Sequence, residues 1–235
     1  MKHTALFIAI ILLLLSCETT RQIGNPVNQN DLNNDTMIIQ SLFNDKASTI
    51  SEEGIQKILD GTYRLPQQLR VAIVRIENNQ QKRYYYWNDE DYLKTQQSYL
   101  DLFEDKFKHS TRVTKVSIIP DLLISKTPSF TNIREAAVRL QADVVVIYSI
   151  SGDIYSKYKF FTKPDIKAFA TTQLIILDVR TGLIPFSTIV TKDVVSQKKK
   201  EELDNSEAKN RIQNEAVLLT INEIAQKIAA FLTEK

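Results

Sequence analysis

The chain has 235 residues, of which 43% are hydrophobic and 25% are charged, so it can bury the core of a globular domain. Its formal net charge of +2 gives no reason to expect nucleic acid or another polyanion as a partner. Glycine occurs only five times, and neither GxGxxG nor GxxxxGK[ST] is present, so the sequence predicts no phosphate-binding loop.

The N-terminus has the pattern of an export signal. Residues 1–17 read MKHTALFIAIILLLLSC, with Lys2 as a basic start and an apolar run of 11 residues from position 5 to position 15. This run is too short for a transmembrane helix, which needs about 20 apolar residues, but it has the length of a signal-peptide core. It ends in Leu-Leu-Ser-Cys, which resembles the lipobox of bacterial lipoproteins. The resemblance implies a signal peptide over residues 1–16 that is cut between Ser16 and Cys17.

Cys17 is the candidate lipidation site. It is the single cysteine of the chain, which excludes an intramolecular disulfide. In the lipoproteins that the motif resembles, this cysteine carries two or three acyl chains such as palmitate, and several chains together hold a protein firmly on a membrane. A buried cysteine or an uncleaved anchor is the alternative, but the polar residues after Cys17 offer neither of them a packing partner. We therefore expect a lipid-anchored protein of the cell envelope, in the outer membrane and facing the periplasm.

A tether and a short helical extension are expected before the main domain. The tether covers residues 17–35, whose five asparagines and few apolar residues cannot build a core. The extension covers residues 36–66 and holds two predicted helices, the second of which is capped by Ser51 and ends at Gly61. The apolar faces of these two helices consist of Met37, Ile38, Ile39, Leu42 and Phe43 in the first and of Ile55, Ile58 and Leu59 in the second.

The main domain, over residues 67–235, opens with two predicted strands joined by a helix. The first strand is expected over residues 69–77, which read LRVAIVRIE. The helix is expected over residues 89–109 because apolar residues recur on one face, and the second strand is expected over residues 112–119.

A second helix is expected over residues 132–141. Asn132 is its predicted N-cap, and Glu135 is the predicted capping-box partner. A buried strand follows at residues 143–150, which read DVVVIYSI.

The remaining elements are strand-like runs and one long helix. The helix is expected over residues 206–233, with an apolar stripe of a kind that usually covers a sheet. The runs lie at 154–161, 166–179 and 183–195, and the stripe consists of Val217, Ile221, Ile224, Ile228 and Leu232. The order βαβαβββα predicts an α/β fold with a single mixed sheet, in which two crossover helices join parallel strands and an antiparallel meander follows.

Three segments of the main domain resemble a group of envelope proteins. They are Arg70-Val71-Ala72-Ile73-Val74, the helix-to-strand step over residues 137–150, which includes Ala142-Asp143, and the turn Leu177-Asp178-Val179-Arg180-Thr181-Gly182. They are similar to the periplasmic α/β domain of the curli-secretion channel lipoprotein, the penicillin-binding-protein activator lipoproteins and the N-terminal domain of the Tol–Pal translocation protein. The resemblance implies an anticodon-binding-domain-like fold, in which Asp143 orders a loop and Gly182 supplies a turn with positive φ.

Little in the sequence points to catalysis. His109 is the one histidine after the signal peptide, and at a helix end it is expected to cap carbonyl groups. No GxSxG motif is present, and Asp101, Glu104 and Asp105 lie among lysines, as on a solvated helix face. We predict no catalytic residues, no metal site and no cofactor; an enzyme that uses carboxylates alone is the third-ranked alternative.

Four consecutive aromatic residues, Tyr84, Tyr85, Tyr86 and Trp87, are the unusual feature of the chain. On a strand their rings would alternate between the two faces. We favour a segment that packs half of these rings. The alternative is an exposed aromatic patch for a protein or glycan partner.

The predicted function is that of a non-catalytic envelope lipoprotein that binds or assembles other envelope proteins. The alternative is a subunit of a curli-type secretion apparatus, which would need hairpins that span a membrane. We expect no pore, because the arm over residues 154–161 has eight residues with Lys157 and Lys159 on one face, whereas a spanning strand needs about 9–11 residues and an unbroken apolar face. No returning strand follows the run at 183–195, so a second hairpin is not expected either.

Overall fold

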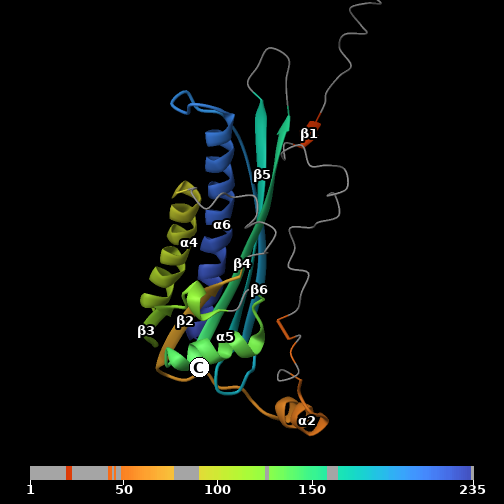
Figure 1. The fold of residues 1–235 in the computed structure, drawn as a ribbon, viewed down its shortest axis with the longest axis vertical. Helices are drawn as coiled ribbons and strands as arrows, with labels where there is room; N and C mark the ends of the chain where they lie inside the picture. The colour runs from red at the N-terminus through yellow and green to blue at the C-terminus, as the bar shows by residue number, and fades with distance from the viewer. Residues whose placement is uncertain are drawn as a thin grey trace, which may run out of the picture.

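The computed structural model describes residues 20–22, 42–43, 45, 49–76, 90–124, 127–157 and 164–233 (Figure 1). One mixed sheet runs in the order β3-β2-β4-β5-β6, with a short strand β1 paired to β4. The strands are β1 (Thr20–Gln22), β2 (Leu69–Arg75), β3 (Val113–Ile118), β4 (Val144–Lys157), β5 (Asp165–Asp178) and β6 (Phe186–Gln197). The helices are α2 (Glu52–Asp60), α4 (Glu90–Lys108), the 3₁₀ turn η3 (Asp121–Leu123), α5 (Phe130–Arg139) and α6 (Asn205–Thr233).

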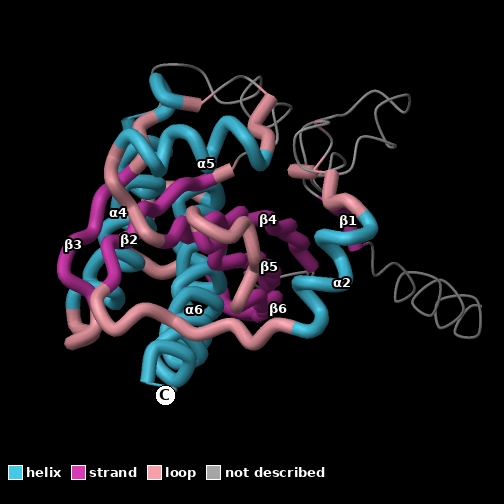
Figure 2. Tube along the Cα trace, turned by 90° about the horizontal axis from the view of Figure 1, so that it is seen from below, coloured by secondary structure: helices cyan, strands magenta, loops and turns pink. Residues whose placement is uncertain are grey.

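The main domain has the predicted α/β fold and order. Strand β2 is parallel to both β3 and β4, whereas β4, β5 and β6 are antiparallel. The chain moves from β2 to β3 through α4 and then returns past β2 to β4 through α5. Helix α4 packs on the face of β2 that carries Val71 and Ile73, and α5 packs on the face that carries Ala72 and Val74. The two helices therefore lie on opposite faces of the sheet, as right-handed crossovers require. Figure 2 shows α5 on one side of the sheet and α6 on the other.

Each face of the sheet has its own core. On the first face α4 and α6 pack against a large cluster that includes Phe103, Tyr148 and Ile176. On the second face α5 packs against a smaller cluster that includes Ile133 and Leu177. Helix α6 contributes the predicted stripe, and all five of its residues are buried: Val217, Ile221, Ile224, Ile228 and Leu232.

Helix α6 is, among the residues that the structure describes, the one helix long and apolar enough to cross a membrane by length and composition. Its buried residues pack on β5 and β6. The apolar character of α6 is thus accounted for by its place in the core.

The longest strands depart from the sequence prediction. The sequence shows separate strand-like runs at residues 143–150 and 154–161, but β4 joins them into a single strand of 14 residues. Three strands therefore follow α5, as the order βαβαβββα requires. Strand β5 pairs with β4 along its whole length, from Val144 with Asp178 to Lys157 with Asp165. This continuous backbone pairing overrides Gly152 and Asp153, which are poor strand formers.

Helix α5 begins two residues earlier than predicted. Its N-cap is Ser129, whose side-chain oxygen accepts the backbone N–H of Asn132, so Asn132 is not the cap. Phe130, the first helical residue, is buried and donates its backbone N–H to the carbonyl oxygen of Leu42. The helix start is therefore set by packing with a distant segment, whereas the local capping pattern pointed to Asn132.

The predicted tether and helical extension are confirmed in part by the structure. Ser51 caps α2 by accepting the backbone N–H of Gly54, and α2 ends at Gly61. Three residues of the predicted tether, Thr20–Gln22, form β1. The apolar residues Met37, Ile38 and Ile39 of the first predicted helix lie outside the described residues.

Asp143 joins three segments at one end of the sheet. Its Oδ2 accepts the backbone N–H of Arg70 at 3.0 Å, and its Oδ1 accepts Arg70 Nη2 at 2.9 Å. Arg180, in the turn after β5, lies 3.5 Å from the same carboxylate. The Arg70 guanidinium lowers the pKa of Asp143 to about 2. Asp143 thus orders the loop before β4, as the resemblance implied.

Replacing Asp143 by Asn should lower the free energy of unfolding by about 2 kcal/mol at neutral pH. Because the pKa of Asp143 is lower in the folded than in the unfolded chain, its contribution is complete above a pH of about 4 and is lost as the pH falls toward 2. Urea unfolding at stepped pH should show the wild type and Asp143→Asn converging in acid. Asp101→Asn, at an exposed position on α4, is the control that should track the wild type throughout.

Candidate functional site

The predicted lipidation and aromatic residues are outside the part of the chain that the structure describes. This applies to Ser16 and Cys17 and to the run of Tyr84, Tyr85, Tyr86 and Trp87. The lipidation and the partner patch therefore stay predictions.

Helix α4 and His109, the residue that follows it, carry the side chains considered for catalysis. His109 Nδ1 lies 2.7 Å from the carbonyl oxygen of Asp105, which is the capping role expected for it. Glu104 pairs with Lys108 at 2.7 Å, and Asp101 accepts Gln97 Nε2 at 2.7 Å on the exposed surface. Each of these contacts is local to one helix. Among the described residues, no group of three His, Cys, Asp or Glu side chains is placed to hold a metal ion.

Helix α2 has one charged side and one apolar side. Glu53 pairs with Lys57 at 2.8 Å on the charged side. Ile55, Ile58 and Leu59 follow the i, i+3, i+4 spacing that places residues on one side of a helix, and we call them the apolar side of α2. All three are exposed, Leu59 by 73%, and no residue of α2 is buried.

The segment after α2 is fixed to the sheet. We call residues 61–68 the strap. Within it, Tyr63 donates its hydroxyl hydrogen to Asp178 Oδ2 at 3.0 Å, and burial together with this carboxylate raises the pKa of Tyr63. The other oxygen of Asp178 accepts the backbone N–H and the hydroxyl of Thr181. Gly182 completes this turn with a φ of 76°, as the resemblance implied.

The segment before α2 is fixed as well. The Phe43 ring stacks on the Phe130 ring of α5 with centroids 5.0 Å apart. Asp45 Oδ2 accepts the backbone N–H of Thr131 at 3.3 Å. Both flanks of α2 are thus held on the domain, while Figure 2 shows the helix itself standing apart from α4, α5 and α6. The sequence predicted α2 and its apolar residues, but local pattern could not show that this side would remain uncovered.

A second exposed surface lies on the long part of the sheet, on the face opposite to α6. Tyr155 donates to Asp153 at 2.8 Å and meets the Phe169 ring edge-on. Lys167 lies 4.5 Å from the centre of the Phe169 ring and pairs with Asp193 at 3.1 Å. The side chains of this surface bond to and pack on one another, whereas α2 exposes apolar side chains such as Leu59.

Comparison with known proteins gives no family for the chain. No family model matches it, and no curated protein matches it. Solved structures do match, with TM-scores below 0.5.

Three of these structures span a range of bacteria. A candidate lipoprotein from Caulobacter crescentus is 10% identical, with 69% of this chain and 89% of that chain covered and a TM-score of 0.39. The hypothetical protein CT253 from Chlamydia trachomatis is 15% identical, with coverages of 71% and 98% and a TM-score of 0.39. A minor lipoprotein from Acinetobacter baumannii is 10% identical, with coverages of 68% and 92% and a TM-score of 0.34.

Proposed function

We propose that this protein is a non-catalytic envelope lipoprotein, anchored through lipid on Cys17, that binds another envelope protein through the apolar side of α2. The observation that carries the binding role is the exposure of Ile55, Ile58 and Leu59 on a helix whose two flanks are held on the domain. The anchor rests on the sequence: the basic start, the apolar run and the Leu-Leu-Ser-Cys ending of residues 1–17. The proposed location is the outer membrane, with the domain facing the periplasm.

The apolar side of α2 suits one mode of recognition. Short amphipathic helices bind by laying residues at i, i+3 and i+4 into an apolar groove of a partner. Exposed apolar side chains that are scattered need no explanation, but a contiguous group on an amphipathic helix indicates an interaction site. The anchored flanks favour binding further, because less conformational entropy is lost when the binding element is already in place.

Site-specific photo-crosslinking in intact cells tests this role. A photoreactive amino acid at Leu59 should crosslink to one defined envelope protein, and the band should weaken at least tenfold when Ile55→Lys is added, because a charge then enters the apolar contact. Gln56→Lys adds the same charge at a polar position of the same helix and should leave the band unchanged. Equal crosslinking in the Ile55→Lys and Gln56→Lys variants would show that the apolar side of α2 is not the binding surface.

The secretion-subunit alternative has less support. The expectation that its hairpin arm would be too short was wrong, because β4 and β5 each have 14 residues. The prediction from composition still argues against a spanning role. Ser149, Ser151 and Asp153 of β4 lie on the face away from α6, and a lipid-facing strand needs an apolar band. A carboxylate-dependent enzyme remains the third candidate. The acidic residues Asp101 and Glu104 of α4 give it little support, because each is bound to a neighbour on the same helix, Asp101 to Gln97 and Glu104 to Lys108.

A further inference from the structure

The three long strands end at the same level of the sheet. Lys157, the last residue of β4, pairs with Asp165, the first of β5, and Asp165 pairs with Gln197, the last of β6. We call this row the far end of the sheet. It lies at the top of Figure 1, and α2 and α5 lie toward the bottom.

Strand β1 reaches the same row. Thr20 pairs with Lys157, and Gln22 pairs with Tyr155, so β1 is antiparallel to β4. Followed toward the N-terminus, β1 therefore runs along the outer edge of β4 and out past the far end. Cys17 is three positions before Thr20 in the chain, and three steps of extended chain span at most about 11 Å. The lipidation site is thus confined to the neighbourhood of the far end.

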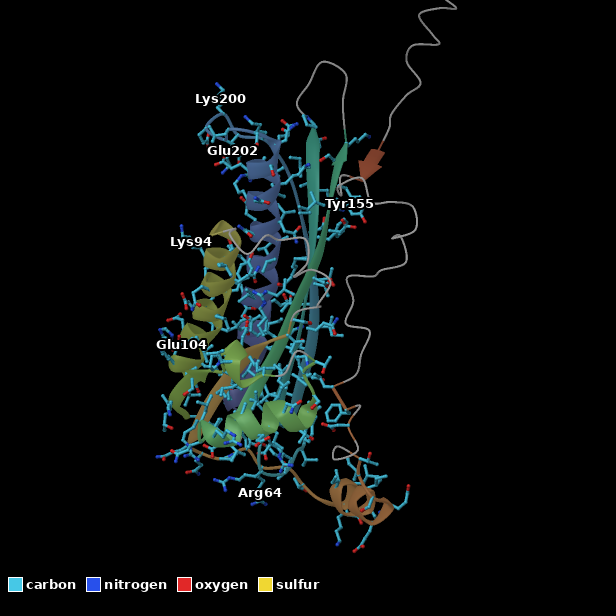
Figure 3. The ribbon with its side chains drawn as sticks, viewed as in Figure 1. Arg64, Lys94, Glu104, Tyr155, Lys200 and Glu202 are labelled. Atoms are coloured by element: carbon cyan, nitrogen blue, oxygen red, sulfur yellow. The ribbon has the colours of Figure 1, made fainter. Side chains whose placement is uncertain are left out.

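The loop between β6 and α6 lies at the far end as well. It begins with Lys198, Lys199 and Lys200, and Figure 3 shows Lys200 and Glu202 at this end of the molecule. The carboxylate of Glu202 is turned inward, where it accepts Arg211 Nε and the backbone N–H of Lys199. Asp204 is likewise engaged, since it accepts the backbone N–H groups of Ser206 and Glu207 at the start of α6. Lys199, Lys200 and Glu201 are exposed. The two lysines are side chains of the kind that anionic phospholipid headgroups attract.

The opposite end is one strand length away. The strap is bound at Asp178, the last residue of β5, through Tyr63. The 14 residues of β5 extend about 45 Å. Arg64, next to Tyr63, and α2 are therefore separated from the far end by about the whole length of the sheet, as Figure 3 shows for Arg64.

We propose that the anchored protein stands upright on the membrane, with the far end of the sheet against the phospholipid headgroups and α2 held at the opposite end. This inference rests on the proposed lipidation of Cys17. The upright orientation gives the pairing of β1 with β4 a role, because this pairing shortens the free chain between the anchor and the domain. The sheet then holds the apolar side of α2 away from the bilayer. A fully extended tether over residues 17–35 would allow every orientation, whereas β1 leaves only three residues of slack.

A fluorescence-quenching experiment tests the orientation. Lipidated protein is placed in vesicles of phosphatidylethanolamine and phosphatidylglycerol that contain a lipid with a nitroxide on its headgroup. Lipidation consumes the only native thiol, so a cysteine introduced at Lys200→Cys or at Arg64→Cys takes the fluorophore alone. Both positions are exposed, and circular dichroism checks that each variant is folded.

The expected result is strong quenching at position 200 and none at position 64, since nitroxide quenching acts over distances far shorter than the sheet. Equal quenching at the two positions, or stronger quenching at position 64, would overturn the upright orientation while leaving the lipid anchor intact. Failure of the protein to float with the vesicles, with a second fluorophore taken up at Cys17, would instead overturn the anchor and the orientation together.

Discussion

The domain carrying Ile224→Asp should be largely unfolded at room temperature. Ile224 is 0% exposed in the middle of the α6 stripe, and it belongs to the cluster that α4 and α6 form on the sheet. The substitution removes a buried aliphatic side chain, which costs about 2–5 kcal/mol, and adds an unpaired carboxylate, which costs several more. Typical domains are stable by only about 5–15 kcal/mol, so the loss takes most or all of the stability.

Urea or thermal unfolding followed by circular dichroism measures this effect. Leu219→Asp is the matched control, because Leu219 lies on the same helix but is 46% exposed. We expect the control to change the free energy of unfolding by about 0.5 kcal/mol, as surface substitutions usually do. Similar melting temperatures for the two variants would mean that the stripe is not the core-facing side of α6.

Cys17→Ala should abolish membrane attachment. The sulfur atom of Cys17 is the atom to which the proposed lipid is joined, and the chain has no second cysteine that could replace it. Each buried methylene contributes about 0.8 kcal/mol to membrane affinity, so loss of the acyl chains removes essentially all of the anchoring. Cells fed labelled palmitate should show no label on this variant, which should accumulate as a precursor of larger size.

Ser16→Ala is the control for the lipidation experiment. It keeps a small residue before Cys17, so labelling and processing should continue as in the wild type. Palmitate label that persists on Cys17→Ala would contradict the anchor. It would also remove the basis for the upright orientation, whereas the binding role of α2 would remain to be judged by crosslinking.

The anchor, the sheet and α2 form a single arrangement if both proposals hold. The lipid would hold the far end of the sheet at the headgroups, and the about 45 Å of β5 would carry the strap and α2 away from them. The strap would then have a mechanical role, because the Tyr63–Asp178 hydrogen bond ties α2 to the end of that strand. A partner in the periplasm would meet α2 first.

The sequence alone determined the features that depend on local pattern. The α6 stripe was predicted residue by residue, because an apolar residue at every third or fourth position has one physical solution, a helix with one side buried. The order βαβαβββα and the split into parallel and antiparallel pairs followed from element lengths and from the rules for crossovers. The caps Ser51 and Gly61 were also predicted, since each depends on a few neighbouring residues, and the positive φ of Gly182 was implied by the resemblance.

Only the tertiary structure decided what depends on residues far apart in the chain. Continuous pairing with β5 makes β4 one strand, although Gly152 and Asp153 suggest a break. The contact of Phe130 with Leu42 and Phe43 sets the start of α5 at Ser129. The pairing of β1 with β4 brings the polar N-terminal segment to the far end of the sheet, and the strap leaves the apolar side of α2 uncovered. Backbone pairing and burial are collective properties of distant segments, so no local pattern encodes them.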